Sequence, residues 1–264
     1  MKPYKIIIIT GASSGIGKSF ANALANRPGI DEIFLISRAK SSIKSATVKI
    51  TNISADLGGR GGARVISEII AKLQKTNHRI VIDTLINNAG FGVYGNFADQ
   101  DPGMVLDMLD INVVAPVAIL GAALPHMDRG SRIINVASLA AFAPMGGFAA
   151  YAASKAFMLD FTVGIRAELK SRGIKTIALC PGSVDTNFSM VASCGARARV
   201  PHGANPDAVA AKCLADLERG RAMSVMKFVW RAKAFMSHLC GKSFLARFTM
   251  IFEKRPSTPV VIPA

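Results

Sequence analysis

Cysteine is scarce in this chain, and its four cysteines show no metal-ligand or disulfide pattern. Cys180, Cys194, Cys213 and Cys240 form no CxxC pair and have no histidine at a ligand spacing. Zinc sites use closely spaced Cys and His pairs, and disulfide frameworks belong to small secreted domains. We therefore expect no metal site and no disulfide, and a cytoplasmic location fits best.

A long apolar run is also lacking at the amino terminus, although MKPYKIIII has the basic start of a secretory signal. Its isoleucine run covers only residues 6–9 and leads directly into TGASSGIG. A signal peptide needs about 7–15 consecutive apolar residues. We interpret the segment as a buried strand.

Acidic residues are few, because 17 Asp and Glu stand against 32 Lys and Arg, which gives a net charge of +15. Such an excess fits attraction to nucleic acid, to an anionic membrane or to a phosphorylated ligand, and it fits an ordinary solvated surface equally well. No motif that reads nucleic acid accompanies the charge, so no nucleic-acid partner is expected.

Apolar segments alternate with longer helical segments along nearly the whole chain. The expected strands are Lys5–Thr10, Glu32–Ser37, Thr47–Ile53, Ile80–Asn87, Arg132–Ser138 and Lys175–Cys180. Several are rich in β-branched residues, which is typical of strands buried on both faces. The alternation predicts an α/β fold with a Rossmann-like, doubly wound parallel sheet. We expect one domain over residues 1–228 and a basic helical extension over residues 229–264.

Helix ends carry recognisable signals. Asp101-Pro102 and Asn205-Pro206 each combine an N-cap residue with proline at the first helical position. Gly173 and Gly220 stand where two helices are expected to end, because glycine readily adopts the left-handed conformation of a C-cap.

A glycine-rich loop, TGASSGIG at residues 10–17, separates the first expected strand from a helix expected to begin near Lys18. Glycines allow the backbone to approach a pyrophosphate, which then lies at the positive end of the helix. The expected phosphate-binding residues are Gly11, Ser13, Ser14, Gly15, Ile16 and Gly17.

The second expected strand ends at Ser37-Arg38, where NAD-binding folds often have an acidic residue for the ribose 2′-hydroxyl. Arg38 would instead bind a 2′-phosphate through charge-assisted hydrogen bonds, with Ser13 and Lys18 nearby. This favours NADP(H) over NAD(H). The alternative is that Arg38 stacks on adenine, which would leave the cofactor choice open.

Tyr151 and Lys155 are four residues apart in the helical segment AAYAASKAFMLDF, so they project from one helix face. A neighbouring ammonium favours the phenolate and lowers a tyrosine pKa that is normally about 10, which would make Tyr151 an acid–base group. Ser138, at the end of an expected strand, would orient a substrate oxygen at the same sheet edge. Without that context, the pair would be an ordinary surface pair.

Further segments complete the pattern: NNAG at residues 87–90, Asn112, and PGSVDT at residues 181–186. With TGASSGIG, Ser138 and YAASK, they resemble the classical short-chain dehydrogenase/reductase family from about Tyr4 to Thr186. The resemblance implies hydride transfer between a nicotinamide and a substrate carbon. Tyr151 would transfer the proton, Ser138 would hold the reacting oxygen, and Lys155 would bind the nicotinamide ribose.

The resemblance also implies further cofactor contacts and a homodimer or homotetramer that pairs through the helices bearing Asn112 and Tyr151. The implied cofactor contacts include the glycine loop, Arg38, Tyr151 and Lys155. The further ones are Asp56, Leu57, Asn88, Ala89, Gly90, Pro181, Gly182, Val184 and Thr186. Asp56 and Leu57 would flank the adenine, and residues 181–186 would cover the nicotinamide.

Asn112 precedes Pro116 by four residues, and proline has no N–H to donate to its carbonyl. That carbonyl would be free to hold a water, as the family's proton relay through Asn112 and Lys155 requires. The alternative is a proline kink without functional content.

Residues expected beside the nicotinamide are mainly apolar. They are Phe91, Tyr94, Leu139–Phe142, Met145, Phe148, Phe188 and Met190. Such a lining favours a small hydrophobic carbonyl or alcohol substrate over a sugar, although some of these residues would also suit a core.

After Thr186 the chain departs from the common family pattern. We expect a helix at Pro206–Arg219 and an edge strand at Arg221–Phe228, followed by mixed basic and apolar residues. The basic residues are Arg231, Lys233, Lys242, Arg247, Lys254 and Arg255, and the apolar ones include Trp230, Phe235, Leu239, Phe244, Leu245 and Phe248. The segment is too charged to span a bilayer. Peripheral contact with an anionic membrane, packing over the active-site mouth and burial in a subunit interface remain as alternatives.

The sequence therefore predicts an NADP(H)-dependent oxidoreductase that interconverts a carbonyl and a secondary alcohol. The alternative is a catalytically silent, NADP(H)-binding regulatory protein with the same fold. A silent protein would be expected to lack part of the catalytic set, whereas Asn112, Ser138, Tyr151 and Lys155 are all present.

Overall fold

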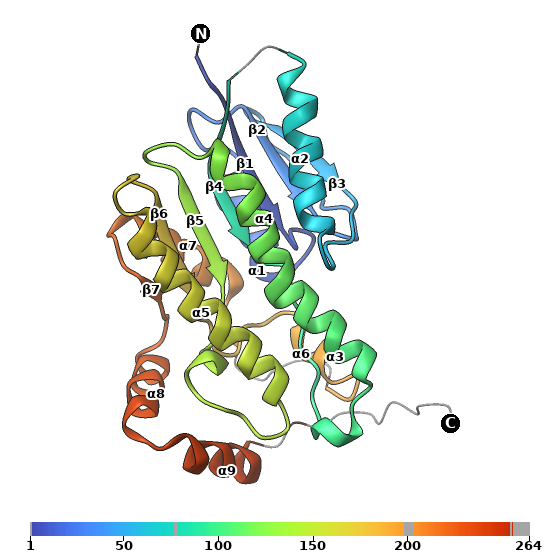
Figure 1. Ribbon diagram of the computed structural model, residues 1–264, viewed down its shortest axis with the longest axis vertical. Coiled ribbons are helices and arrows are strands. Elements are labelled where there is room, and N and C mark those ends of the chain that lie inside the picture. The colour runs from blue at the N-terminus through green and yellow to red at the C-terminus, as the bar shows by residue number, and fades with distance from the viewer. Residues whose placement is uncertain (1, 77–78, 198–202, 254, 256–264) are drawn as a thin grey trace.

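Seven parallel strands form the centre of the molecule in the computed structural model, which describes residues 2–76, 79–197, 203–253 and 255. The strands are β1 (Tyr4–Thr10), β2 (Glu32–Ile36), β3 (Lys49–Ile53), β4 (Ile80–Asn87), β5 (Arg132–Val136), β6 (Lys175–Leu179) and β7 (Met223–Ser224). Their order is β3-β2-β1-β4-β5-β6-β7, and neighbouring strands are paired in parallel (Figure 1). The predicted Rossmann-like α/β fold is confirmed.

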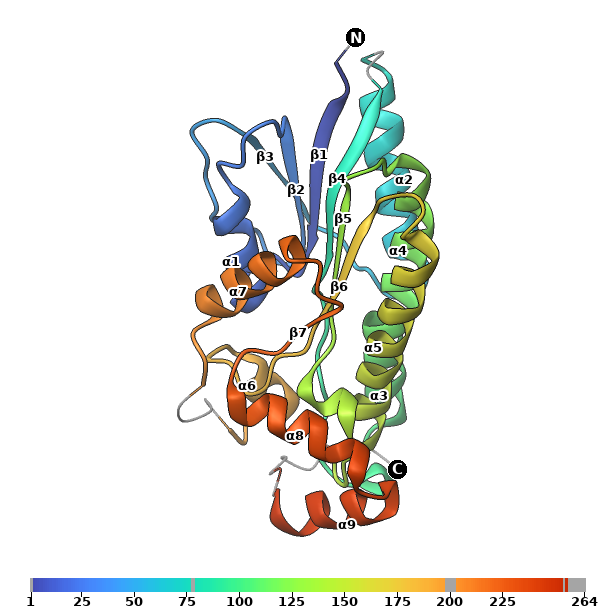
Figure 2. The same ribbon diagram turned by 90° about the vertical axis from the view of Figure 1, so that its left-hand side faces the viewer.

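Helices cover both faces of the sheet, as Figure 2 shows. One face carries α1 (Gly15–Leu24) and α7 (Pro206–Glu218), and the other carries α2 (Gly61–Gln74), α4 (Ala115–Ala123) and α5 (Ala149–Leu169). The remaining elements are η1 (Phe97–Asp99), α3 (Pro102–Leu109), η2 (Asp110–Val114), η3 (Leu124–His126), η4 (Leu139–Phe142), α6 (Phe188–Ala192), α8 (Phe228–Leu239) and α9 (Lys242–Phe252).

The isoleucine run of β1 explains why the sheet is covered on both sides. Ile7 and Ile9 belong to the apolar cluster beneath α1 and α7, whereas Ile6 and Ile8 belong to the cluster beneath α2 and α4. All four are fully buried, because successive side chains of a strand point to opposite faces. The run is therefore a central strand.

The predicted helix caps are confirmed. Asp101 Oδ1 accepts a hydrogen bond from Gly103 N at 2.8 Å, and Asn205 Oδ1 accepts one from Asp207 N at 2.7 Å. Gly173 and Gly220 follow α5 and α7 with φ of 70° and 71°, in the left-handed region that glycine adopts without steric cost.

Some predicted boundaries were wrong. The helix expected near Lys18 begins at Gly15, and β5 ends at Val136, because Ser138 already caps η4. The edge strand expected over Arg221–Phe228 is only β7, which pairs with β6 over two residues. Phe228 instead begins α8, where Trp230 and Ala234 are buried at helical spacing.

The helical stretch Pro102–His126, which contains α3, η2, α4 and η3, is long and apolar enough to cross a membrane by composition. In its most apolar window the mean hydropathy is 1.8, and 39% of that window is buried inside the fold. Because α4 packs against α2 and β4, we assign this stretch to the helical layer of the α/β fold.

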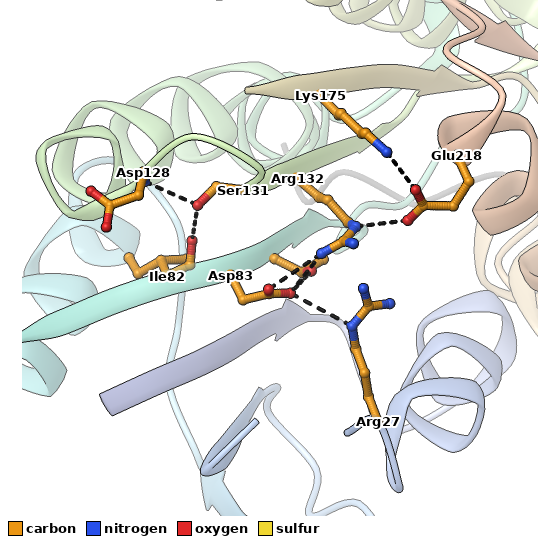
Figure 3. Close-up of polar contacts among 9 residues, drawn as sticks. Arg27, Ile82, Asp83, Asp128, Ser131, Arg132, Lys175 and Glu218 are labelled. Carbon is orange, nitrogen blue, oxygen red and sulfur yellow. Dashed lines mark hydrogen bonds and ion pairs between the residues drawn. The ribbon is translucent and has the colours of Figure 1, made fainter. Parts of the chain in front are cut away.

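An ionic cluster ties the strands together near their amino-terminal ends (Figure 3). Arg132 Nη1 is 3.0 Å from Asp83 Oδ2, and Arg132 Nε is 2.9 Å from Glu218 Oε1 on α7. Lys175 also contacts Glu218, and Arg27 lies beside Asp83. A hydrogen bond from Lys175 lowers the pKa of Glu218, with Arg132 acting in the same direction.

We expect Arg132→Met to destabilise the protein by about 2–4 kcal/mol, because the largely buried Asp83 carboxylate loses its close partner, whereas the exposed Glu218 keeps Lys175. Urea unfolding at neutral pH measures the change. Arg79→Met is the matched control, since the exposed Arg79–Asp128 pair is expected to contribute at most about 1 kcal/mol. If the two substitutions lower the free energy of unfolding equally, the cluster stabilises the protein no more than an exposed ion pair does.

Candidate active site

A cleft of about 1230 Å³ opens at the carboxyl ends of the strands. In the sheet, β2 and β3 lie on one side of β1, and β5, β6 and β7 lie on the other side of β4. The strand order therefore reverses between β1 and β4, and open α/β sheets bind ligands at such a switch point. The volume exceeds the roughly 300–1,000 Å³ of common small-molecule pockets. The cleft therefore has room for a dinucleotide and a second molecule.

Nearly all the predicted site residues line this cleft. They are Gly11, Ser13, Ser14, Gly15, Ile16, Arg38, Asp56, Leu57, Asn88, Ala89, Gly90, Ser138, Tyr151, Lys155, Pro181, Gly182, Val184 and Thr186. Gly17, Lys18 and Asn112 do not line it. The expectation for Met190 was wrong: it is exposed on the outside of α6, because Phe188 and Val191, three residues apart, face the cleft instead.

The glycine loop is packed so tightly that side chains do not fit. A Cβ on Gly17 would lie 2.3 Å from Gly11 O, and one on Gly11 would lie 2.7 Å from Asn88 Nδ2. Asn88 Nδ2 donates to Thr10 O at 2.9 Å and to Gly11 O at 3.2 Å, which fixes the loop to the end of β4. The amino end of α1 therefore faces the cleft at a rigid, positively polarised position suited to phosphate.

Arg38 follows β2 at the far end of the cleft. Its side chain is exposed, lines the cleft and forms no ion pair within the described part of the chain. Ser54 Oγ donates to Arg38 O at 3.1 Å, and Leu57 is buried beside it after β3. This end offers a free guanidinium and an apolar wall.

Tyr151 and Lys155 face each other across one turn of α5. Lys155 Nζ lies 5.7 Å from the centre of the Tyr151 ring and donates to Val136 O at 3.0 Å. The Tyr151 ring stacks on Phe148 with centroids 4.1 Å apart, and Ser138 forms a hydrogen bond with the Tyr151 side chain. These side chains converge on one point of the cleft.

The expected lowering of the Tyr151 pKa is not found. Burial raises the pKa of Tyr151 well above its usual range, and the Ser138 hydrogen bond only partly offsets this. Lys155 is itself buried and bonded to a backbone carbonyl, and burial lowers its pKa to about 8. Within the chain, Tyr151 is therefore held as the neutral phenol, the form that donates a proton.

The charge of Lys155 makes stability depend on pH. An unfolded lysine titrates near pH 10.4, so between about pH 8 and pH 10 the unfolded chain binds more protons than the folded one. Stability therefore rises with pH across this window, by about 3 kcal/mol, and is flat below it. Urea unfolding measures the free energy of unfolding of the wild type and of Lys155→Met. The wild-type value minus the Lys155→Met value should rise by about 3 kcal/mol between pH 7 and pH 10.

Lys170→Met, at the exposed carboxyl end of the same helix, is the control and should show the pH dependence of the wild type. If Lys155→Met also retains the wild-type pH dependence, the inference of a buried, destabilising ammonium is wrong.

Asn112 lies behind the cleft wall, in the π-helical turn η2. Its Nδ2 donates to Phe91 O at 2.9 Å and to Ser154 Oγ at 3.1 Å, and its Oδ1 accepts from Phe91 N at 3.2 Å. These bonds join the loop after β4 to α5. The relay through the Asn112 carbonyl stays a prediction.

Sequence reasoning missed a buried network of polar side chains between the strands and the helix that carries Tyr151 and Lys155. Asn87 Nδ2 donates to Asn135 Oδ1 at 2.9 Å, and Asn135 Nδ2 donates to Thr162 Oγ1 at 3.0 Å. The network links β4, β5 and α5 and so fixes the helix that carries Tyr151. The available signal was an asparagine directly after two apolar residues in each of two strands.

The part of the cleft beside Tyr151 is aromatic and apolar. Tyr94 contacts Phe148 edge-on with ring centroids 4.6 Å apart, and Phe188 lies 5.4 Å from Tyr151. The predicted residues Phe91, Leu139, Ala140, Phe142 and Met145 also line the cleft, whereas Ala141 does not.

The carboxyl-terminal helices complete the cleft, which supports packing over the mouth among the three alternatives. A Cβ on Gly182 would lie 2.4 Å from the Trp230 ring of α8, so glycine is required there. Thr249 Oγ1 on α9 accepts from Gly146 N at 3.1 Å, and the Arg255 guanidinium lies 5.7 Å from the Phe148 ring centre. Lys254 and residues 256–264 lie outside the described residues. Arg197, which was not predicted, and Lys233 of α8 also line the cleft.

Comparisons with known proteins agree with this geometry. The sequence pattern of the family described as short chain dehydrogenase matches residues 5–195. The probable oxidoreductase EphD of Mycobacterium tuberculosis is 35% identical over 197 residues, which cover 69% of this chain and 31% of that protein. The chain thus spans about a third of the length of this relative.

Solved structures share the architecture. A short-chain dehydrogenase from Sphingobium yanoikuyae in complex with NADPH has a TM-score of 0.71 and 25% identity, covering 89% of this chain and 93% of that chain. A short chain dehydrogenase/reductase from Burkholderia phymatum in complex with NAD has a TM-score of 0.77 over 99% of both chains. At 19% identity, the second similarity shows the fold alone.

Proposed function

The chain belongs to the short-chain dehydrogenase/reductase family, and from this premise we propose that it interconverts a carbonyl and a secondary alcohol with a nicotinamide dinucleotide. The convergence of Ser138, Tyr151 and Lys155 in the cleft that contains the glycine loop carries the proposal. The tyrosine supplies a proton, and the loop supplies a cofactor site. Both are needed for this reaction.

The residues present fit such a cofactor. The glycine loop leaves a cradle that a Cβ at Gly11 or Gly15 would disturb, and the amino end of α1 faces it. Ser13, Ser14 and Ile16 would hold the phosphates there, and residues 181–184 and Thr186 line the same cleft. When bound, the nicotinamide supplies or accepts the hydride.

For reduction, Tyr151 gives its phenolic proton to the carbonyl oxygen as the carbon gains hydride, and the product is the alcohol. Its raised pKa keeps the proton available, and Ser138 holds the oxygen within reach. Lys155 contributes positive charge beside the phenol as the proton leaves. Oxidation runs the same transfers in reverse.

Arg38 supports NADP(H) as the preferred cofactor. The two structural relatives above bind different cofactors, NADPH in one and NAD in the other, so the preference must come from this chain's own residues. A guanidinium free of ion pairs in the described structure suits a 2′-phosphate, which a carboxylate at that position would repel.

The aromatic lining supports a small hydrophobic ketone or alcohol as substrate. Phe148, Tyr94 and Phe188 offer large apolar surfaces beside Tyr151 and few hydrogen-bond partners for a sugar. The cytoplasmic location stays part of this proposal.

Self-association through the helices of one sheet face is also proposed. Val114, Val117, Phe157 and Val163 are each about two-fifths exposed on η2, α4 and α5. Side chains of this kind on adjacent helices suit an interface with a second copy. Light scattering should give a mass of at least two chains.

The decisive test measures NADPH and NADH oxidation across ketones, aldehydes and 3-oxoacyl compounds. We expect turnover on hydrophobic ketones and a preference for NADPH. Tight NADPH binding without turnover on any member of the panel would favour the silent regulatory protein instead.

A further inference from the structure

Helix α8 is apolar on two opposite faces. Trp230 and Ala234 are buried against the body of the protein. Phe228, Phe235 and Leu239 recur at positions i, i+7 and i+11 on the other side and are 76%, 65% and 67% exposed. A helix that only covers an active site needs one apolar face, so the outer face of α8 is unexplained by packing.

Helix α9 repeats the arrangement. Thr249 and the following segment fix its inner face to residues 144–146, because Thr249 bonds Gly146 N and Arg255 bonds Gly146 O at 3.0 Å. Phe244, Phe248 and Phe252 form a row along its length with ring centroids 6.1 Å and 4.8 Å apart. These rings and Ile251 are 43–69% exposed, so α9 also carries an exposed apolar stripe.

Basic residues surround these stripes. Residues 227–253 and 255 contain Lys227, Arg231, Lys233, Lys242, Arg247 and Arg255. Glu253 is the one acidic residue among them, and it is already engaged by Arg255 and Lys233. The exposed surface of α8 and α9 is therefore both apolar and positively charged.

Figures 1 and 2 show α8 and α9 at one end of the molecule, beyond the carboxyl ends of the strands, with α9 outermost. No other part of the ribbon projects past α9 in that direction. Both helices can therefore approach a flat surface together.

We propose that α8 and α9 form a docking surface for an anionic phospholipid bilayer. Aromatic and aliphatic side chains would enter the interface between headgroups and acyl chains, and the surrounding lysines and arginines would contact lipid phosphates. Charge decides against a second copy of this chain, since an interface that pairs this face with itself would bring two basic surfaces together.

The same surface continues into the cleft, which suggests a route for substrate and rests on the proposed function. Phe244, Phe248 and Phe252 are exposed and also line the cleft. The lining of the cleft thus includes Phe148 near Tyr151 and the phenylalanines of α9. A lipophilic ketone dissolved in the bilayer would reach the catalytic residues along this lining.

Vesicle flotation tests the docking surface without any turnover assay. The full chain is mixed with vesicles of phosphatidylcholine alone or of phosphatidylcholine with phosphatidylglycerol. We expect at least about tenfold stronger binding to the anionic vesicles, weakened by high salt. Absence of binding to anionic vesicles would overturn the proposal and leave the proposed reaction untouched.

Two double variants separate the apolar and electrostatic contributions. Phe235→Ser with Leu239→Ser, and Arg231→Gln with Arg247→Gln, change exposed residues that do not line the cleft. Each pair should weaken binding to anionic vesicles by at least about tenfold. NADPH binding and thermal unfolding should stay at the wild-type values, which shows that the fold is intact.

Matched controls place the same changes elsewhere on the surface. Phe97→Ser replaces a phenylalanine that is 70% exposed in η1, and Lys75→Gln with Arg219→Gln removes two exposed charges. Vesicle binding should change less than about twofold in each control. If the Phe235 and Leu239 pair binds vesicles like wild type, or if it instead splits an oligomer into monomers, the proposal is wrong.

Discussion

Tyr151→Phe is expected to reduce kcat for ketone reduction by about 10³-fold or more, since the carbonyl oxygen loses its proton donor. The phenyl ring keeps the stacking contact with Phe148 at 4.1 Å and the burial of the original side chain. NADPH binding should therefore stay within about twofold of wild type, as measured by quenching or calorimetric titration. The loss should appear in kcat and kcat/KM alike.

Tyr94→Phe is the matched control for this experiment. Tyr94 lines the same cleft, packs edge-on against Phe148 and has a pKa that burial raises in the same direction. Removal of its hydroxyl should change kcat only a few-fold. A Tyr151→Phe enzyme as active as this control would exclude Tyr151 as the acid–base group, and the proposed mechanism with it.

Arg38→Asp should raise the KM for NADPH by about 100-fold or more while changing that for NADH only a few-fold. The substitution removes two charge-assisted hydrogen bonds to a 2′-phosphate, each contributing about 1.5–3 kcal/mol, and adds a repelling carboxylate. The new carboxylate would also accept a bond from the ribose 2′-hydroxyl of NADH. The ratio of kcat/KM for the two cofactors is the measurement.

Lys40→Asp makes the same charge change two residues away, on an exposed side chain that does not line the cleft. It should leave the ratio within a few-fold of wild type, because a solvated charge at the rim is screened. Arg38→Gln should give a ratio of kcat/KM for NADPH and NADH that lies between the wild-type ratio and the Arg38→Asp ratio. A cofactor ratio that Arg38→Asp leaves unchanged would support stacking on adenine over recognition of the 2′-phosphate.

Where backbone chemistry decides the structure, the sequence was a reliable guide. The four consecutive isoleucines of β1 had to be buried on both sides, and they are. Asp101 and Asn205 cap helices because their side chains reach the free N–H groups of the first turn. The spacing of Tyr151 and Lys155 likewise determines that both side chains share one helix face.

Properties set by the tertiary environment could not be predicted in this way. The Tyr151 pKa depends on how deeply α5 is buried: burial raises it and the Ser138 hydrogen bond only partly opposes this, although Lys155 lies one turn away. Met190 and Val191 look equally suitable for an apolar wall, and only the orientation of α6 selects Val191. The boundary between β7 and α8 was missed because apolar residues on both sides fit either periodicity.

The contact between Trp230 and Gly182 gives the molecule a built-in optical probe. Trp230 is the only tryptophan in the chain, it is 9% exposed, and its indole packs on the segment that lines the cleft beside Tyr151. Its emission therefore reports on the contact between α8 and that segment, without a label and without background from other indoles. Binding of a reduced dinucleotide and adsorption to a vesicle can each be followed as a change in the Trp230 emission spectrum of the same sample.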